Sequence, residues 1–187
     1  MGIATRTPDD VAPEAEPLPV GTYEEALTWV GKSRSSRVGA VDVNDAMIKA
    51  YASRLEDGNP AYWDDEIADG IWGGRISPPG MLLVWLRPLQ WQPDGTVPGW
   101  PLAPSVPLPG DTLIGTTTET EFYRSMRIGD RLSVVETVLA VSPLKKTAAG
   151  PGHFVKTEAR YRNQDGRLVA LERLTLLRFS SGKGTAS

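Results

Sequence analysis

The chain has 187 residues and a formal net charge of −3, with 40% hydrophobic and 23% charged residues. This length and composition predict one globular domain, and the weak negative charge argues against a nucleic-acid or acidic-membrane partner. The sequence contains no cysteine, which excludes disulfides, thiolate metal sites and cysteine nucleophiles.

The N-terminal segment differs in composition from the rest of the chain. Residues 1–20 hold four prolines and several acids, which predicts a flexible arm without the apolar core of a signal peptide. The longest apolar run, Met81 to Leu86, is far shorter than the ~20 residues that cross a membrane. We therefore expect a cytoplasmic protein with one domain at 21–180 and a flexible tail at 181–187.

Two helices and a strand are predicted in the first third. Tyr23 to Val30 carries apolar residues at helical spacing, and Arg37 to Val41 is typical of a short strand. A second helix is expected from 43 to about 55, with Asp42 as its N-cap. Asn59-Pro60 follows as a helix stop.

The middle of the chain places polar turns beside apolar runs. Asp64, Asp65 and Glu66 suit the acidic first turn of a short helix. Residues 79–91 are apolar nearly all round, which predicts a buried helix that Pro88 kinks or ends. The proline-rich segment 92–111 predicts a long loop without regular structure, of the kind that is often functional.

The last third is rich in β-branched residues. Four long strands are predicted at 112–123, 131–142, 153–163 and 168–179, separated by turn signals such as Gly129-Asp130 and Gln164-Asp165-Gly166. We expect an antiparallel meander of these strands. Helices followed by strands predict an α+β fold with one sheet packed on a buried helix.

The octapeptide from Asp57 to Asp64, DGNPAYWD, resembles the hydratase signature of the MaoC-like (R-specific enoyl-CoA hydratase) family, which runs Gly-Asp-x-Asn-Pro-[apolar]-His-x-Asp. The Gly-x-Ile-x-Pro-Pro-Gly stretch before residue 81, and Glu121-Phe122-Tyr123 ahead of Arg127-Ile128-Gly129-Asp130-Arg131, are also similar. The resemblance covers roughly residues 23–179. It implies a single hot-dog fold, in which an antiparallel sheet wraps around a central helix, here residues 79–91.

The branch that this chain resembles most is the FAS1-like dehydratase type, which includes subunits of heteromeric hydratases in mycolic-acid synthesis and steroid side-chain degradation. The resemblance implies that Asp57 is the catalytic carboxylate. The partner histidine of the family is replaced by Tyr62, and a phenol with an ordinary pKa near 10 is a poor base at neutral pH. The only histidine, His153, is far from the motif in sequence.

Three hypotheses follow from this departure. In the first, the chain shapes the acyl-thioester pocket of a heteromeric enoyl-CoA hydratase or 3-hydroxyacyl dehydratase, for a bulky acyl chain such as a steroid side chain. A hot-dog partner with an intact Asp and His then performs the acid–base chemistry. In the second, a homodimer or larger homo-oligomer uses Asp57 as base, assisted by Tyr62 or a backbone amide. In the third, the chain is a non-catalytic acyl or polyketide binder.

Further residues are candidates for substrate binding by position or chemistry. Backbone amides at a helix N-terminus bind carbonyl oxygens, arginines bind phosphates and aromatic side chains line apolar cavities. The candidates are Asn59, Trp63, Gly80, Met81, Trp91, Trp100, Arg124 and Arg127. For most of them a purely structural role is the commoner outcome. No metal or cofactor is expected, and the substrate is a thioester of coenzyme A or acyl carrier protein. Hot-dog thioesterases generally carry an Asp or Glu on the central helix. Met81 to Trp91 contains no acid, which argues against a thioesterase.

Overall fold

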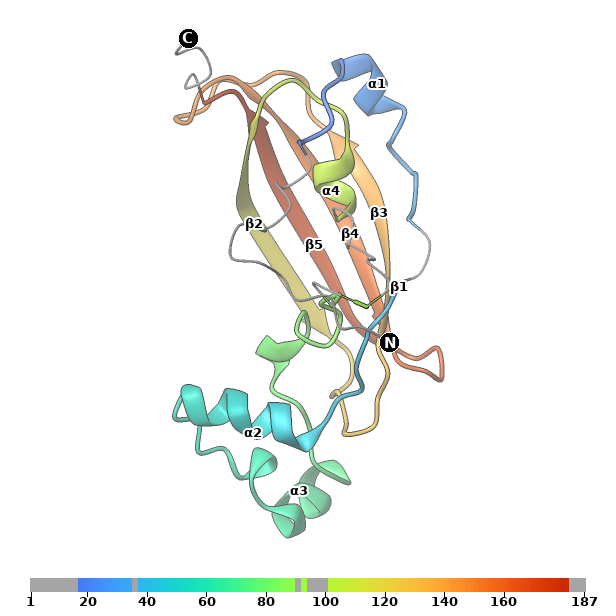
Figure 1. The fold of residues 1–187 in the computed structure, drawn as a ribbon, viewed down its shortest axis with the longest axis vertical. Coiled ribbons are helices and arrows are strands. Elements are labelled where there is room, and N and C mark those ends of the chain that lie inside the picture. Colours follow the sequence, from blue (N-terminus) through green and yellow to red (C-terminus); the bar gives the residue numbers. More distant parts are fainter. Residues whose placement is uncertain (1–16, 35–36, 90–91, 94–100, 182–187) are drawn as a thin grey trace.

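One antiparallel sheet organises the chain (Figure 1). The computed structural model describes residues 17–34, 37–89, 92–93 and 101–181. The five strands of the sheet have the spatial order β1-β3-β4-β5-β2. Their bounds are Arg37–Val38 for β1, Thr112–Phe122 for β2, Ser133–Val141 for β3, Gly152–Arg162 for β4 and Leu168–Phe179 for β5. The predicted α+β class is confirmed, and all four long strands lie where alternation placed them.

The predicted meander of four strands is wrong for β2. Strands β3, β4 and β5 are consecutive neighbours, but β2 pairs with β5, so that Thr112 lies opposite Phe179. The segment after β2 leaves the sheet before β3 begins. It forms a bridge between Arg127 and Ile76, and it buries the side chain of Met126. Gly129 and Asp130 therefore belong to a crossover, not to a hairpin.

Short helices occupy both ends of the sheet. Their bounds are Tyr23–Leu27 for α1, Asp45–Arg54 for α2, Asp65–Trp72 for α3 and Leu102–Ser105 for α4, with 3₁₀ turns at Pro60–Tyr62 (η1) and Pro79–Met81 (η2). Asp64 caps α3 as the acidic run predicts. The N-cap of α2 is Asn44 rather than Asp42, because Asn44 accepts the amide of Met47 at 3.0 Å. Asp42 instead accepts a hydrogen bond from Arg131.

The predicted helix at 79–91 is wrong in form, although its burial is confirmed. A single 3₁₀ turn is followed by further turns, in which the amide of Leu82 donates to Pro79 and that of Val84 to Met81. Prolines at 78, 79 and 88 lack the amide hydrogens of a continuous helix. Trp85 is fully buried among these turns, and its indole N–H donates to Ser77 Oγ at 2.9 Å. The segment 79–86 still fills the core at one end of the sheet.

The proline-rich segment 92–111 is also more ordered than predicted where the structure describes it. It contains α4, whose residues Leu102 and Ala103 are buried against the sheet. Beyond α4, Val106 and Leu108 are buried too. This segment therefore contributes part of the core.

The core consists of two apolar clusters on the same face of the sheet. The larger combines Ile48 of α2 and Trp85 with the β3–β5 end nearest α2, and the smaller combines Ala26 of α1 and Leu102 of α4 with the opposite end. Figure 1 shows α2 and α3 at one end of the long sheet and α1 at the other. No helix among the described residues is long and apolar enough to cross a membrane.

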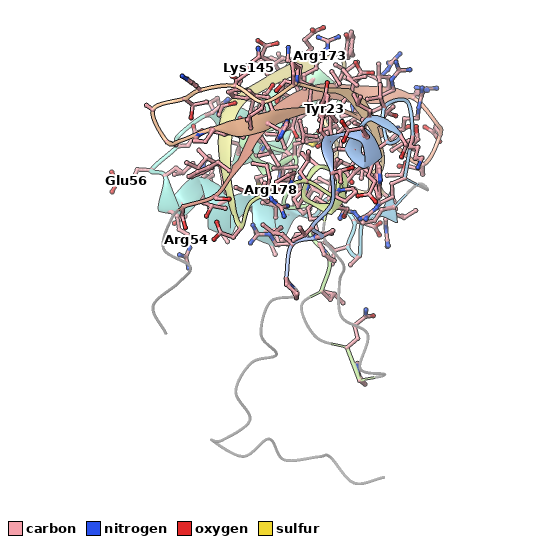
Figure 2. All side chains as sticks on the ribbon, turned by 90° about the horizontal axis from the view of Figure 1, so that it is seen from above. Tyr23, Arg54, Glu56, Lys145, Arg173 and Arg178 are labelled. Carbon is pink, nitrogen blue, oxygen red and sulfur yellow. The ribbon has the colours of Figure 1, made fainter. Side chains whose placement is uncertain are left out.

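One buried arginine ties three segments together at the α1 end. Arg178 of β5 is 1% exposed, and its guanidinium donates to the carbonyls of Gly110 at 2.6 Å and Pro19 at 3.0 Å. Figure 2 shows Arg178 among packed side chains, whereas Glu56 lies at the periphery. Burial lowers the pKa of Arg178 from its ordinary value. Because both carbonyls need a donor, the arginine holds residues 17–20 onto the sheet.

Candidate functional site

The turn that carries Asp57 is shaped by its own side chains. The chain reverses after α2 at Glu56, which has a φ of 52°, and the amide of Asp57 donates back to Ala52 at 2.9 Å. Asp57 Oδ1 accepts the amide of Asn59 at 3.0 Å, and Asn59 Oδ1 accepts the amide of Ala61 at 3.1 Å. Such side-chain-to-backbone bonds stabilise turns. Asp57 is half-buried, and Asn59 caps η1.

Tyr62 lies buried beside this turn, at 5% exposure. Burial raises the pKa of its phenol, and the negative charge of Asp57 raises it further. A phenol whose pKa is raised stays protonated at neutral pH, so it can donate a hydrogen bond but cannot act as a base. Trp63 is 42% exposed, and its indole N–H donates to the carbonyl of Asp57 at 2.8 Å.

A second tyrosine joins the site, which the sequence did not single out. Tyr51 of α2 faces Gly80, where a Cβ atom would lie only 2.5 Å from the tyrosine Oη. Its phenol also contributes to the raised pKa of Tyr62. Helical spacing predicts that Tyr51 lies on the apolar face of α2, but gives no signal about its hydroxyl. The structure thus gathers Tyr51, Asp57, Tyr62 and Gly80 at the start of the turns over residues 79–86, which we call the central turns.

The backbone at the start of the central turns is already engaged at Met81. Its amide donates to the carbonyl of Pro78 at 3.0 Å, and its side chain is 1% exposed within the larger apolar cluster. The expected role of Gly80 as a donor to a thioester carbonyl stays a prediction. Trp91 and Trp100, predicted to line an apolar cavity, lie outside the described residues.

The two candidate arginines differ in their surroundings. The guanidinium of Arg127 donates to the carbonyls of Trp72 and Gly73, and so closes the C-terminus of α3. Arg124, just beyond β2, is exposed, and its amide donates to Val169 at 3.3 Å. Binding of coenzyme A phosphates by either arginine stays a prediction.

The only histidine of the sequence lies far from Asp57. His153 is the second residue of β4, and its ring stacks on Tyr23 of α1 with centroids 5.3 Å apart. Its Nδ1 lies 2.9 Å from the carbonyl of Ser142. Asp57 follows α2, and α1 and α2 are at opposite ends of the sheet (Figure 1). No imidazole of this chain can therefore share a proton with Asp57.

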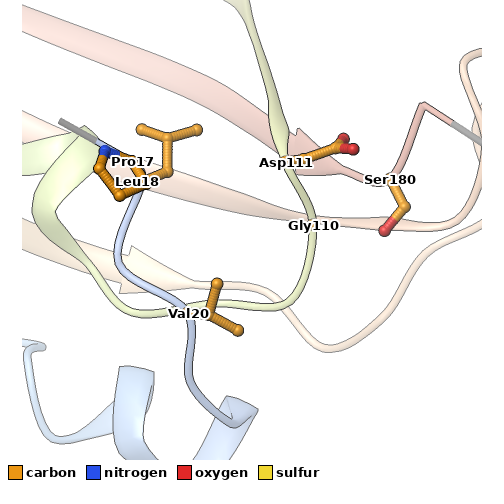
Figure 3. Close-up of a pocket in the computed structure, with 6 residues that line it drawn as sticks. All are labelled: Pro17, Leu18, Val20, Gly110, Asp111 and Ser180. Atoms are coloured by element: carbon orange, nitrogen blue, oxygen red, sulfur yellow. The ribbon is translucent and has the colours of Figure 1, made fainter. Parts of the chain in front are cut away.

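A hollow with a volume of ≈ 430 Å³ lies at the α1 end, not at Asp57 (Figure 3). It is lined by Pro17, Leu18, Val20, Gly110, Asp111 and Ser180. Asp111 accepts the hydroxyl of Thr112 at 2.8 Å and the amide of Ser181 at 3.1 Å, and these bonds lower the pKa of its carboxyl. Across the described ranges, no three His, Cys, Asp or Glu side chains gather closely enough to hold a metal ion.

A long antiparallel sheet, a buried apolar segment against its inner face and an Asp-x-Asn-Pro turn at one end define a hot-dog domain of the hydratase type. The family model described as "FAS1-like, dehydratase domain region" matches residues 28–172, and the chain therefore belongs to this family.

Two curated relatives are similar in sequence. A probable enoyl-CoA hydratase alpha subunit of Thermomonospora curvata is 35% identical over 171 residues, which are 86% of this chain and 53% of the relative. A 3-oxo-4,17-pregnadiene-20-carboxyl-CoA hydratase alpha subunit of Mycobacterium tuberculosis is 28% identical over 147 residues, or 73% of this chain and 45% of the relative. The chain thus spans about half the length of these relatives.

Solved structures confirm the hot-dog fold. A chain of the ChsH1-ChsH2 complex from Mycobacterium tuberculosis superimposes with a TM-score of 0.71 at 24% identity, covering 85% of this chain and 96% of that one. The MaoC-like dehydratase from Rhodospirillum rubrum superimposes with a TM-score of 0.53 at 25% identity, covering 81% and 92% of the two chains.

Proposed function

We propose that this chain is the pocket-forming, non-catalytic hot-dog domain of a heteromeric enoyl-CoA hydratase. The observation that carries the proposal is the separation of Asp57 from the only histidine, combined with a buried Tyr62 at the family's histidine position. Addition of water across an enoyl thioester needs a base near the β-carbon and a proton donor for the α-carbon. Asp57 alone, tied into its own turn, offers half of that pair.

The partner in this proposal is a second hot-dog chain that holds an intact Asp and His. Support comes from the alpha-subunit names of the two curated relatives and from the two-component complex that contains a similar fold. In such an assembly this chain contributes walls to the acyl pocket. The other chain positions and activates the water.

The edge strand β2 is the surface that we assign to this partner. Among the described strands it pairs only with β5, and most of its residues are exposed. Ile114 and Phe122 on β2, and Tyr123 just after it, are 42–53% exposed. An exposed edge of this length is a template for pairing with another sheet. A second hot-dog sheet would both cover these side chains and complete the pairing.

A bulky acyl chain is the substrate class that we propose. The pregnadiene-carboxyl-CoA named for one relative is a steroid thioester. A regular helix over residues 79–91 would run about 20 Å along the inner face of the sheet. The central segment instead forms successive short turns over residues 79–86, so it does not continue along that face as one regular helix.

The self-sufficient homo-oligomer remains the alternative to test. Two features argue against it: Asp57, the base in that alternative, is tied into its own turn, and the raised pKa of Tyr62 makes its phenol a weaker proton donor.

The decisive experiment uses this chain alone, its candidate hot-dog partner alone and the two co-expressed. Hydration is followed by the loss of enoyl-thioester absorbance, with crotonyl-CoA and a steroid enoyl-CoA as substrates. We expect activity in the complex, a loss of about 10²–10⁴-fold when the partner's histidine is replaced, and a change within about threefold for Asp57→Asn in this chain. Asp165→Asn, in an exposed turn, is the matched control. Hydration by this chain alone that Asp57→Asn abolishes would overturn the proposal.

A further inference from the structure

A row of polar side chains crosses the inner face of the sheet between the two apolar clusters. Cross-strand pairing places Glu136 opposite Ala159, Ala159 opposite Glu172, and Glu172 opposite Thr120. The neighbouring row contains Arg37, paired with Val134, and Tyr161. Because side chains of directly paired residues share a face, these groups lie on one side of the sheet. We call Arg37, Thr120, Glu136, Tyr161 and Glu172 the polar belt.

The belt lies on the same face of the sheet as the two apolar clusters. Val134, Ala159 and Tyr161 belong to the larger cluster, while Val138 and Val155, further along the same strands, belong to the smaller one. Burying charged groups between two apolar regions costs free energy unless they are paired. In this belt Tyr161 is buried, whereas Arg37, Thr120, Glu136 and Glu172 are half-buried. A polar partner would therefore stabilise those of their polar groups that water does not reach.

The hydrogen bonds within the belt do not use every acceptor position of its two carboxylates. Tyr161 donates to Glu172 Oε1 at 3.1 Å, and Thr120 reaches Glu172 Oε2 only at 3.4 Å. Glu136 Oε2 accepts the amide of Leu102 at 3.4 Å. A carboxylate has room for about four hydrogen bonds, so both can accept further donors.

Arg37 supplies a hydrogen-bond donor without a partner. Its Nε is buried and has no hydrogen-bond partner, and within the described ranges the guanidinium forms no salt bridge. Its positive charge acts on Tyr161, as do the negative charges of Glu136 and Glu172. Burial, followed by the charge of Glu172, raises the pKa of Tyr161, which keeps its phenol a donor. The belt thus contains one buried N–H without a hydrogen-bond partner and two carboxylates that can accept further hydrogen bonds.

We infer that the polar belt binds a hydroxyl group carried by the acyl chain, remote from the thioester. A hydroxyl accepts one hydrogen bond and donates one, so it can take the Nε–H of Arg37 and donate to Glu136 or Glu172. A ketone would satisfy the arginine but not the carboxylates. This inference deepens the proposed function and rests on it, since it places the acyl chain against the inner face of the sheet.

The test compares two thioesters that differ by one hydroxyl, ω-hydroxydodecanoyl-CoA and dodecanoyl-CoA. Isothermal titration calorimetry measures their affinities for the purified chain and for its complex with the hot-dog partner. We expect the hydroxylated thioester to bind about tenfold more tightly, the scale of one hydrogen bond to a charged group. The nearly isosteric Glu136→Gln and Glu172→Gln, together with Arg37→Met, should remove most of this preference.

Exposed residues of the same types provide the controls: Glu24→Gln and Arg167→Met should keep the preference. Circular dichroism and thermal melting show that each variant is folded. Equal affinity of the unmodified chain for both thioesters, binding of neither, or a preference that the belt variants retain would overturn the inference. A preference that depends on the belt in a complex without hydratase activity would refute the proposed function alone.

Discussion

The buried hydrogen bond between Trp85 and Ser77 offers a sharp test of how the central turns are held. Ser77 is 2% exposed and Trp85 is fully buried, and the indole N–H donates to Ser77 Oγ at 2.9 Å. Ser77→Ala removes the acceptor and leaves the indole N–H buried without a partner. Such an unsatisfied group costs about 1–3 kcal/mol, so we expect about 2 kcal/mol of destabilisation.

Urea unfolding followed by circular dichroism measures this cost. With a denaturant slope of about 2 kcal/mol/M for a domain of this size, the midpoint should fall by about 1 M. Ser133→Ala is the control, because that hydroxyl donates to the carbonyl of Arg162 at 3.4 Å in an exposed setting. It should shift stability by no more than about 0.5 kcal/mol.

A double-mutant cycle isolates the hydrogen bond from the packing of the ring. Trp85→Phe removes the donor, so adding Ser77→Ala to that variant should cost clearly less than it does in the unmodified chain. If Ser77→Ala is no more harmful than Ser133→Ala, or if the two changes are additive, the hydrogen bond does not hold the central turns and the reasoning is refuted.

Three further perturbations test other contacts that hold the fold. The hydrogen bond from Arg131 lowers the pKa of Asp42, so its stabilisation is present above the ordinary value of about 4 and lost as pH falls through the depressed folded value; Asp42→Asn should flatten that part of a profile of urea midpoint against pH. Arg178→Met removes the side-chain donor to the carbonyls of Gly110 and Pro19, of which only the latter keeps another, the amide of Leu108 at 3.4 Å. Calorimetric melts should show about 2 kcal/mol of destabilisation, and an unchanged melting temperature would contradict this role. Gly80→Ala places a Cβ 2.5 Å from the Oη of Tyr51, so we expect a cost of about 1–2 kcal/mol in urea unfolding, most of it relieved by Tyr51→Phe.

The sequence predicted those parts of the fold that depend on local pattern. The strand Leu168–Phe179 has the predicted bounds, and the other long strands differ by one or two residues at their ends, because alternation of buried and exposed side chains is a local property. Pairing of β2 with β5 was not predictable in this way. It depends on where the crossover containing Met126 packs, which is a long-range contact.

The central segment shows a different limit. An apolar run predicts burial, which Met81 and Trp85 confirm, but apolar residues on all sides do not distinguish a helix from successive 3₁₀ turns. Within the site, the motif located Asp57 and the buried Tyr62. It gave no indication of Tyr51, whose hydroxyl reaches Gly80 from another element.

The two apolar clusters have a consequence for how the domain opens. Strands β3 to β5 run through both, yet α1 and α4 pack only on the smaller one. Such an arrangement favours opening in separate cooperative units. Because the apolar cluster at the α1 end is the smaller one, amide hydrogens there should exchange with deuterium before those beside Trp85. One end of the sheet would then open while the Asp57 turn keeps its shape.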